Sequence, residues 1–317
     1  MANFIYNAYG RYLQEKFGTR VHKVSVHAGF TCPNRDGTVA RGGCTYCNIV
    51  SFTPENARPR YSVSDQIEKG IAFLKLRFAA KKFLVYFQPY SNTYAPVEHL
   101  EVLFRDALRH PEVVGLSIGT RPDCMDDEKF AMLAELAQET DLTLEFGIES
   151  VYDETLRLIN RGHDFACTRN AVRRAKAFGL HVTGHTILGF PNETREQMLA
   201  STEVINTLGL DILKIHNLHV VRHTELARQY ERQPFQLFTF EEWRDFVIRY
   251  LERLSPEIII ERLYGDAPAE LLLAPRWNLS RAEIVQGIEK EMQRRKTHQG
   301  RLVQHSPSYA PAVLPQT

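Results

Sequence analysis

The sequence predicts an α/β protein in which parallel strands alternate with helices and curl into a partial (β/α)6 TIM-like barrel. Short runs of β-branched and aromatic residues recur along the chain, and stretches with apolar residues at helical spacing separate them. Regular alternation of this kind is typical of a parallel sheet with right-handed crossovers. The 317 residues are enough for one such barrel with a small C-terminal α/β extension.

The predicted elements follow one another in a regular order. An amphipathic helix comes first, and the strand Val21–Ala28 then leads directly into a cysteine-containing loop. Phe83–Phe87 is apolar throughout, which is typical of a strand buried on both faces of a parallel sheet. The six strands are predicted at residues 21–28, 83–87, 113–118, 142–148, 181–188 and 212–218, with helices at residues 64–80, 97–109, 127–139, 170–178 and 195–207.

Beyond Arg232 this alternation weakens. We expect residues 1–232 to form the barrel with its N-terminal helix and residues 233–305 to form the extension. The extension would contain helices at residues 240–254 and 281–295 and a short strand at residues 257–261. Residues 306–317 include several prolines and are predicted to be a loose tail.

Polar segments, several of which contain Gly or Pro, follow the predicted strands. Because the carboxyl ends of parallel strands open onto one rim, functional residues are expected to gather there. These segments are Gln88–Pro96, Gly119–Asp123, Glu149–Ser150, Gly189–Thr194 and His219–Ala227.

Composition and charge argue against a secreted protein, a membrane-spanning protein and a protein that is basic over its whole surface. The 39 basic and 38 acidic side chains give a formal charge of +1, so a nucleic-acid partner would need a local basic patch. No secretory signal is recognisable and no apolar run approaches the roughly 20 residues that cross a bilayer. We therefore expect a cytoplasmic protein without a membrane partner, in which the five cysteines stay reduced.

Three of these cysteines, Cys32, Cys44 and Cys47, lie in the loop after the first strand. Thiolates at this spacing suit either an iron–sulfur cluster with one open iron or a zinc site completed by His27 or Cys124. Zinc sites usually contain two paired ligand sets, and no second CxxC is present, so a cluster is favoured. Cys124 and Cys167 are isolated and are interpreted as small hydrophobic residues.

Histidines near the sixth strand, His216, His219 and His223, receive no assigned role. Such residues are more often hydrogen-bonded structural side chains than ligands.

The cysteine loop, with Tyr46 before its last cysteine, resembles the radical S-adenosylmethionine (SAM) superfamily. Eleven residues separate Cys32 from Cys44, where that family usually has three. This longer gap is similar to that of the Elongator catalytic subunit and of the YhcC-like subgroup. The resemblance extends from about Asn7 to Leu302 and includes the runs CPNRDG, GGCTYC, YFQPYSNTYAP, GTRPD, LEFGIES, NRGH and GFPNET.

This resemblance implies a [4Fe-4S] cluster held by Cys32, Cys44 and Cys47, with S-adenosyl-L-methionine bound at its fourth iron. One electron, from a donor such as flavodoxin or ferredoxin, would cleave the cofactor to a 5′-deoxyadenosyl radical. Arg161 would hold the cofactor carboxylate and Glu149 the ribose hydroxyls, although each could instead be structural. The other implied cofactor residues are Tyr46 and Ile187, Gly189 and Pro191 near adenine, and Gln88, Ser91, Asn92 and Thr93 near the methionine amino group.

The substrate is open to three interpretations. The resemblance suggests tRNA, with modification of a wobble-uridine side chain, and Lys290, Arg294, Arg295 and Lys296 could contact its phosphates. Those four residues could equally form a solvated helix face. The alternatives are a radical SAM enzyme acting on a small metabolite or tetrapyrrole-like substrate, and a non-catalytic cluster- or zinc-binding protein.

Overall fold

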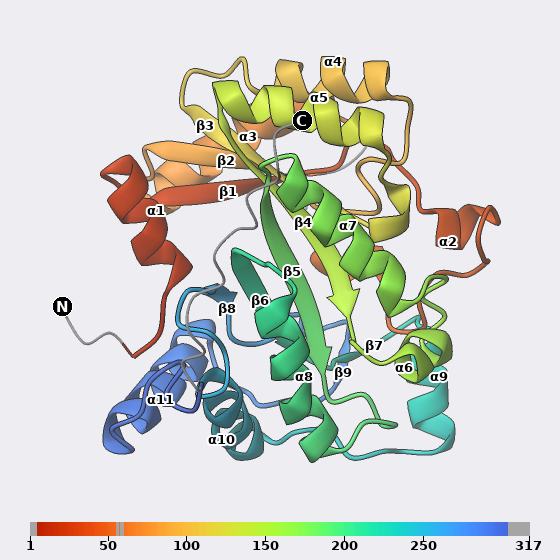
Figure 1. The fold of residues 1–317 in the computed structure, drawn as a ribbon, viewed down its shortest axis with the longest axis vertical. Helices are drawn as coiled ribbons and strands as arrows, with labels where there is room; N and C mark the ends of the chain where they lie inside the picture. Colours follow the sequence, from red (N-terminus) through yellow and green to blue (C-terminus); the bar gives the residue numbers. More distant parts are fainter. Residues whose placement is uncertain (1–4, 55–56, 58–59, 304–317) are drawn as a thin grey trace, which may run out of the picture.

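The computed structural model describes residues 5–54, 57 and 60–303, and in this part of the chain a seven-stranded parallel sheet curls into a partial barrel (Figure 1). The strand order is β1-β2-β3-β4-β5-β6-β8, and every neighbouring pair is parallel. The predicted tail, residues 306–317, lies outside the described residues. The strands are β1 (Val21–Val26), β2 (Lys82–Phe87), β3 (Val113–Thr120), β4 (Asp141–Glu149), β5 (His181–Leu188), β6 (Ile212–Asn217) and β8 (Ile259–Arg262).

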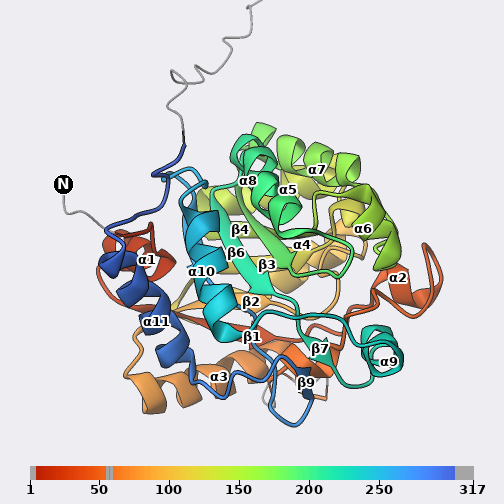
Figure 2. The same ribbon diagram turned by 90° about the horizontal axis from the view of Figure 1, so that it is seen from below.

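Helices cover the convex face of this sheet (Figures 1 and 2). Their buried faces carry Ile67, Phe104, Phe130, Val172 and Ile205, which belong to one hydrophobic core together with the outward-facing residues of the strands. The helices are α3 (Val63–Phe78), α4 (Val97–Ala107), α5 (Asp127–Glu139), α7 (Phe165–Ala177) and α8 (Arg195–Thr207), which confirms the predicted alternation.

The helix predicted at residues 170–178 begins earlier, at Phe165. The Asp164 carboxylate accepts a hydrogen bond from the Cys167 N–H at 2.8 Å and caps the helix there. The first turn, Phe165–Thr168, is mostly apolar, and the capping residue Asp164 immediately before it was the available signal for this start.

The sheet has seven strands rather than the six predicted. β8 was expected to be part of a separate extension, but it pairs in parallel with β6, with Ile259 opposite Ile212. The crossover between them contains α10 (Phe240–Leu251), whose side chains Trp243 and Val247 are fully buried. The sheet therefore continues across residue 232, and a division of the chain at that point stays a prediction.

The amino end of the barrel is covered by α1 (Tyr9–Phe17). Tyr9 and Leu13 pack against Leu84 and Ile212 at the beginning of their strands. α11 (Arg281–Arg294) packs against α10, and Gln299 beyond it donates hydrogen bonds to the carbonyls of Ser255 and Ile258, just before β8. Both ends of the described chain thus lie near the amino ends of the strands.

The carboxyl ends of the strands are framed by short elements in the loops. The cysteine loop forms α2 (Pro33–Asp36) and η1 (Ile49–Phe52), and the other loops form η2 (Pro122–Cys124), α6 (Asp153–Leu158) and α9 (Glu225–Arg232). β7 (Val220–Val221) and β9 (Leu272–Ala274) pair as a small antiparallel ribbon. Among the described helices, none is both long and apolar enough for a membrane crossing.

Candidate functional site

A cavity of about 300 Å³ opens at the carboxyl ends of the strands. Cys32, Cys44 and Cys47 all line it, as the position of the cysteine loop after the first strand predicted. Other residues of the cysteine loop, and residues from β2, β3, β4, β5, β6 and β8 or from the loops after them, form the rest of its wall. The cavity is therefore built at the place where parallel α/β folds carry their functional groups.

The cysteine loop is folded back on itself by Arg35. Cys32 is the N-cap of α2, and the Arg35 guanidinium donates to the carbonyl of Cys47 at 2.8 Å. Gly43 has a φ of +81°, and a Cβ there would lie 2.8 Å from Arg35 Nε. Glycine at this position thus allows both the left-handed turn and the close passage of the arginine.

Hydrogen-bond donors point toward the thiol of Cys44. Asn34 Nδ2 lies 3.6 Å and Arg161 Nη1 lies 3.9 Å from Cys44 Sγ. Ser91 Oγ and Arg161 Nε are buried and make no hydrogen bond within the described chain, which leaves polar atoms available to a bound group. Three thiols, one of which has two donors directed at its sulfur, fit the electron-rich sulfur environment of an iron–sulfur cluster.

The zinc alternative receives no support from the side-chain arrangement. Within residues 5–54, 57 and 60–303, no three His, Cys, Asp or Glu side chains converge as ligands of a single ion would. Thiolates that bind different irons of a cluster need not converge on one point. His27 and Cys124, considered as fourth zinc ligands, do not belong to the cavity wall. Burial raises the pKa of the Cys124 thiol to about 12, as expected for a buried hydrophobic residue.

Arg161 and Glu149 form a buried pair beside the thiols. Arg161 is 5% exposed, donates to the Gly147 carbonyl at 2.6 Å and lies 3.7 Å from Glu149 Oε1. Burial disfavours the charged form, but Glu149 and Cys44 raise the pKa of Arg161, so the guanidinium stays charged. Glu149 has a φ of +64°, a conformation that a non-glycine residue adopts only when its surroundings enforce it.

Four other predicted cofactor residues also line the cavity. They are Tyr46, Gln88, Ser91 and Ile187. Tyr46 contacts the ring of Phe190, with centroids 6.0 Å apart, and burial raises its phenol pKa well above the usual range. Gln88 Oε1 accepts a hydrogen bond from Ser25 at 3.0 Å, which fixes its amide at the cavity wall.

The remaining four, Asn92, Thr93, Gly189 and Pro191, do not belong to the cavity wall. Asn92 Nδ2 donates to the carbonyls of Phe87 and Gly119 and so joins the ends of β2 and β3. The Thr93 hydroxyl is hydrogen-bonded to that of Thr120 at 2.6 Å.

Gly189 has a φ of +111°, and a Cβ there would lie 3.3 Å from the Phe238 ring. Pro191 is exposed. Asn92 and Thr93 thus make hydrogen bonds within the protein, and Gly189 packs against Phe238. Their residue types alone do not tell such a role from cofactor binding.

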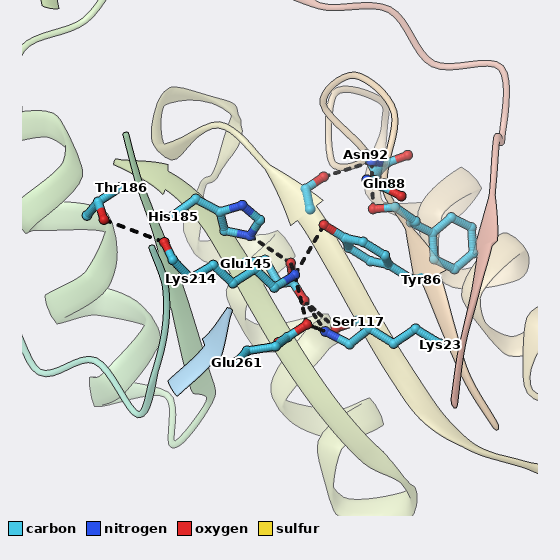
Figure 3. A network of polar contacts seen from close by, with 12 residues as sticks. Lys23, Tyr86, Gln88, Asn92, Ser117, Glu145, His185, Thr186, Lys214 and Glu261 are labelled. Carbon is cyan, nitrogen blue, oxygen red and sulfur yellow. Dashed lines mark hydrogen bonds and ion pairs between the residues drawn. The ribbon is translucent and has the colours of Figure 1, made fainter. Parts of the chain in front are cut away.

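A charged cluster inside the barrel forms the bottom of the cavity, and Figure 3 shows its polar contacts. Glu145 on β4 is 1% exposed and lies at its centre. Glu145 Oε1 accepts hydrogen bonds from Lys23 at 2.8 Å and Ser117 at 2.5 Å, and Oε2 contacts Lys214 at 2.6 Å and His185 Nε2 at 2.8 Å. Glu261 contacts both lysines at 2.7 and 3.1 Å. We call Lys23, Ser117, Glu145, His185, Lys214 and Glu261 the ionic floor.

The charges of the ionic floor balance one another. Burial opposes ionisation, but Lys214 and Lys23 lower the pKa of Glu145 well below its ordinary value, so this carboxylate is ionised. The same lysines lower the pKa of Glu261. Two carboxylates and two ammonium groups thus compensate one another. His185 adds no charge to this balance, because burial and Lys214 lower its pKa.

Two glycines leave space between the ionic floor and the rim. Gly119 and Gly147 both line the cavity. A Cβ on Gly147 would collide with Glu149 Oε1 and lie 2.8 Å from Arg161 Nη2. The absence of side chains here keeps room between the thiols and the charged residues below.

Sequence reasoning did not single out the ionic floor. Its members lie within strands that were interpreted from their apolar and β-branched content, such as LTLEFGI and ILKIH. A single charged residue inside an otherwise apolar buried strand was the available signal.

The basic residues Lys290, Arg294, Arg295 and Lys296 lie at the end of α11 and just after it. Arg294 and Arg295 form ion pairs with Glu291 at 2.7 Å, and Arg295 also pairs with Asp245. Thr297 and Gln299 then contact residues that precede β8. This basic turn therefore lies near the amino end of β8, whereas the cavity lies at the carboxyl ends.

Comparison with known proteins agrees with this geometry. The family model described as the Radical SAM superfamily matches residues 32–205, and the Radical_SAM C-terminal domain model matches residues 210–294. YtqA of Bacillus subtilis is 38% identical over 94% of this chain and 93% of its own length. YhcC of Escherichia coli is 37% identical over 86% of this chain and 87% of its own length.

More distant relatives match only part of their length. A tRNA uridine(34) acetyltransferase of Methanocaldococcus infernus is 30% identical over 50% of this chain, which corresponds to 30% of the acetyltransferase. The solved structure of Elp3 from the same archaeon has a TM-score of 0.65 at 20% identity and covers 88% of this chain and 64% of Elp3, so it supports the fold. From the matched family model and the two relatives that align over nearly their whole length, the chain belongs to the radical SAM superfamily.

Proposed function

We propose that this radical SAM enzyme modifies the side chain of a wobble uridine in tRNA. The observation that carries the proposed radical chemistry is that three thiols, a buried Arg–Glu pair and three residues of the ionic floor, Glu145, His185 and Lys214, line one cavity. The alignment with the M. infernus enzyme, whose name specifies tRNA uridine(34), covers half of this chain and supports the choice of substrate.

Cys32, Cys44 and Cys47 would hold the [4Fe-4S] cluster, and Arg161 and Glu149 would bind the polar groups of SAM. When both are bound and one electron is delivered, for example from flavodoxin or ferredoxin, they supply a 5′-deoxyadenosyl radical that abstracts hydrogen from carbon. Arg161 suits a carboxylate, because its guanidinium can donate two parallel hydrogen bonds. Tyr46, which packs against Phe190, adds aromatic surface to the cavity wall that would help to exclude water.

Contact with tRNA would involve the basic side chains at the mouth of the cavity. Arg35 and Arg262 line the cavity, and Arg262 is exposed. Lys290, Arg294, Arg295 and Lys296 would contact a part of the tRNA farther from the modified base. Phosphate contacts of this kind depend on salt through counterion release.

Anaerobic reconstitution tests the proposal. We expect about four iron and four sulfide per chain, and 5′-deoxyadenosine formed from SAM and dithionite. The nucleoside profile of tRNA from cells that lack the gene should change at the wobble uridine and be restored by the purified enzyme. Retention of tRNA on a filter should weaken as salt rises. An unchanged profile together with no tRNA retention at low salt would refute tRNA as the substrate and favour a small metabolite.

A further inference from the structure

His185 lies where the ionic floor meets the cavity, and one of its ring nitrogens is already engaged. His185 Nε2 is 2.8 Å from Glu145 Oε2, and the residue lines the cavity. In Figure 3 the other ring nitrogen, Nδ1, lies on the side of the ring turned away from Glu145. Within the described chain Nδ1 makes no hydrogen bond with another residue.

The tautomer of His185 follows from the charge of Glu145. Lys23 at 2.8 Å and Lys214 at 2.6 Å hold this carboxylate in its ionised form. An ionised carboxylate can only accept hydrogen bonds, so Nε2 must be the donor. A neutral imidazole carries one proton, so with that proton on Nε2 the Nδ1 atom has a free lone pair. His185 thus presents an acceptor to the cavity.

We propose that His185 is the proton acceptor for the substrate and that Glu145 is its positioning residue. Because Nδ1 is an acceptor with a buried carboxylate behind it, the substrate group that suits it is an ammonium of the uridine side chain close to the carbon that loses hydrogen, so this inference rests on the proposed function. One N–H bond of the ammonium breaks, its electron pair stays on the nitrogen, which becomes a neutral amine, and an Nδ1–H bond forms. The imidazolium that results faces the Glu145 carboxylate, and no oxidant or reductant is needed.

The neighbouring His216 has no carboxylate partner of the kind that His185 has. Its ring is stacked on that of His185, with centroids 5.7 Å apart and an interplanar angle of 17°. His216 Nε2 is buried and has no hydrogen-bond partner in the part of the chain that the structure describes. Burial and the nearby Arg262 lower the pKa of His216 well below the ordinary value. Without a carboxylate to stabilise its charged form, His216 is a poor base, whereas His185 has one.

Several charged and titratable groups surround His185 and set the pH at which it acts. Burial and Lys214 lower the pKa of His185, and the hydrogen bond to Glu145 opposes this shift. The base form is therefore present at neutral pH and is lost as pH falls through a pKa below the ordinary value of about 6.5. The surrounding groups are Lys23 on β1, Tyr86 on β2, Glu145 and Glu149 on β4, Lys214 and His216 on β6, and Glu261 and Arg262 on β8.

The test compares two histidines on one strand in the reconstituted full-length enzyme. His185→Gln removes the acceptor, and His181→Gln changes the exposed histidine at the opposite end of β5. With tRNA from cells that lack the gene, His185→Gln should lower product formation by about 10²-fold or more. It should still form 5′-deoxyadenosine, so the product per 5′-deoxyadenosine falls. The wild-type decline of product formation at low pH should disappear in His185→Gln and persist in His181→Gln.

The proposal would be overturned if His185→Gln forms product at the same rate as the wild type. An equal loss of product and 5′-deoxyadenosine would also overturn it, because that indicates a general collapse of the site. A second measurement does not depend on tRNA or on the folding of this variant. In the ¹⁵N-histidine spectrum of the wild-type chain, we expect the His185 signal of the Nε2–H tautomer. A proton on Nδ1 at neutral pH would refute the role of His185 as proton acceptor. If the wild-type chain shows the expected tautomer but does not modify tRNA, only the proposed substrate is rejected.

Discussion

The ionic floor predicts a large loss of stability when one of its charges is removed. Glu145 is buried and contacts Lys23, Lys214, His185 and Ser117. In Glu145→Gln both lysines would share the single carboxylate of Glu261. Removal of one partner from a buried ionic group leaves an uncompensated charge, so we expect the free energy of unfolding to fall by about 3–5 kcal/mol.

A double variant tests whether charge balance is the cause. Glu145→Gln combined with Lys214→Met leaves one lysine, Lys23, beside one carboxylate, Glu261, at 2.7 Å. We expect the double variant to lose less stability than the sum of the single variants, by about 1–3 kcal/mol. The half-exposed pair of Lys176 and Asp211 provides the control, because Lys176→Met should cost at most about 1 kcal/mol.

Urea unfolding followed by tryptophan fluorescence measures these differences, since Trp243 is fully buried beside the sheet. The folded-state pKa of Glu145 is lowered, so its stabilisation is present above the unfolded value of about 4.3 and is lost as pH falls through the folded value. The difference between wild type and Glu145→Gln should therefore shrink in strong acid. The reasoning would be refuted if the stability losses of the two single variants simply add up in the double variant. It would also be refuted if the stability difference between wild type and Glu145→Gln is the same at all pH values.

Three further predictions concern the bound groups. Cys44→Ser should lose the iron and the visible absorbance of the cluster after reconstitution, whereas Cys167→Ser, outside the cavity wall, should keep both. Gly147→Ala should abolish SAM binding in equilibrium dialysis, because the added Cβ displaces Glu149 and Arg161, whereas Gly10→Ala, with no atom within 4 Å of its Cβ, should bind normally. Arg161→Lys should weaken SAM binding by about tenfold or more, since a lysine cannot donate two parallel hydrogen bonds to a carboxylate, and unchanged calorimetric affinity would contradict that role.

Much of this architecture can be predicted from the sequence. The alternation of strands and helices, the position of the cysteine loop after β1 and the gathering of loops at one rim all follow from local patterns. These features depend on periodicity and on the order of elements, both of which are local properties. The sequence by itself therefore determined the fold class, the three thiols and the end of the barrel at which they lie.

Only the tertiary structure decided what lies beneath the thiols and which rim residues reach the cavity. β8 pairs with β6 across a long connection that contains α9 and α10, and no local pattern specifies that partner. Whether Asn92 or Ser91 faces the cavity depends on the path of the loop that carries them. Lys23, Glu145, Lys214 and Glu261 come from four different strands, and their charges compensate one another only after the sheet has curled. A buried charge is stable only beside its partner, and that pairing is a property of the closed barrel.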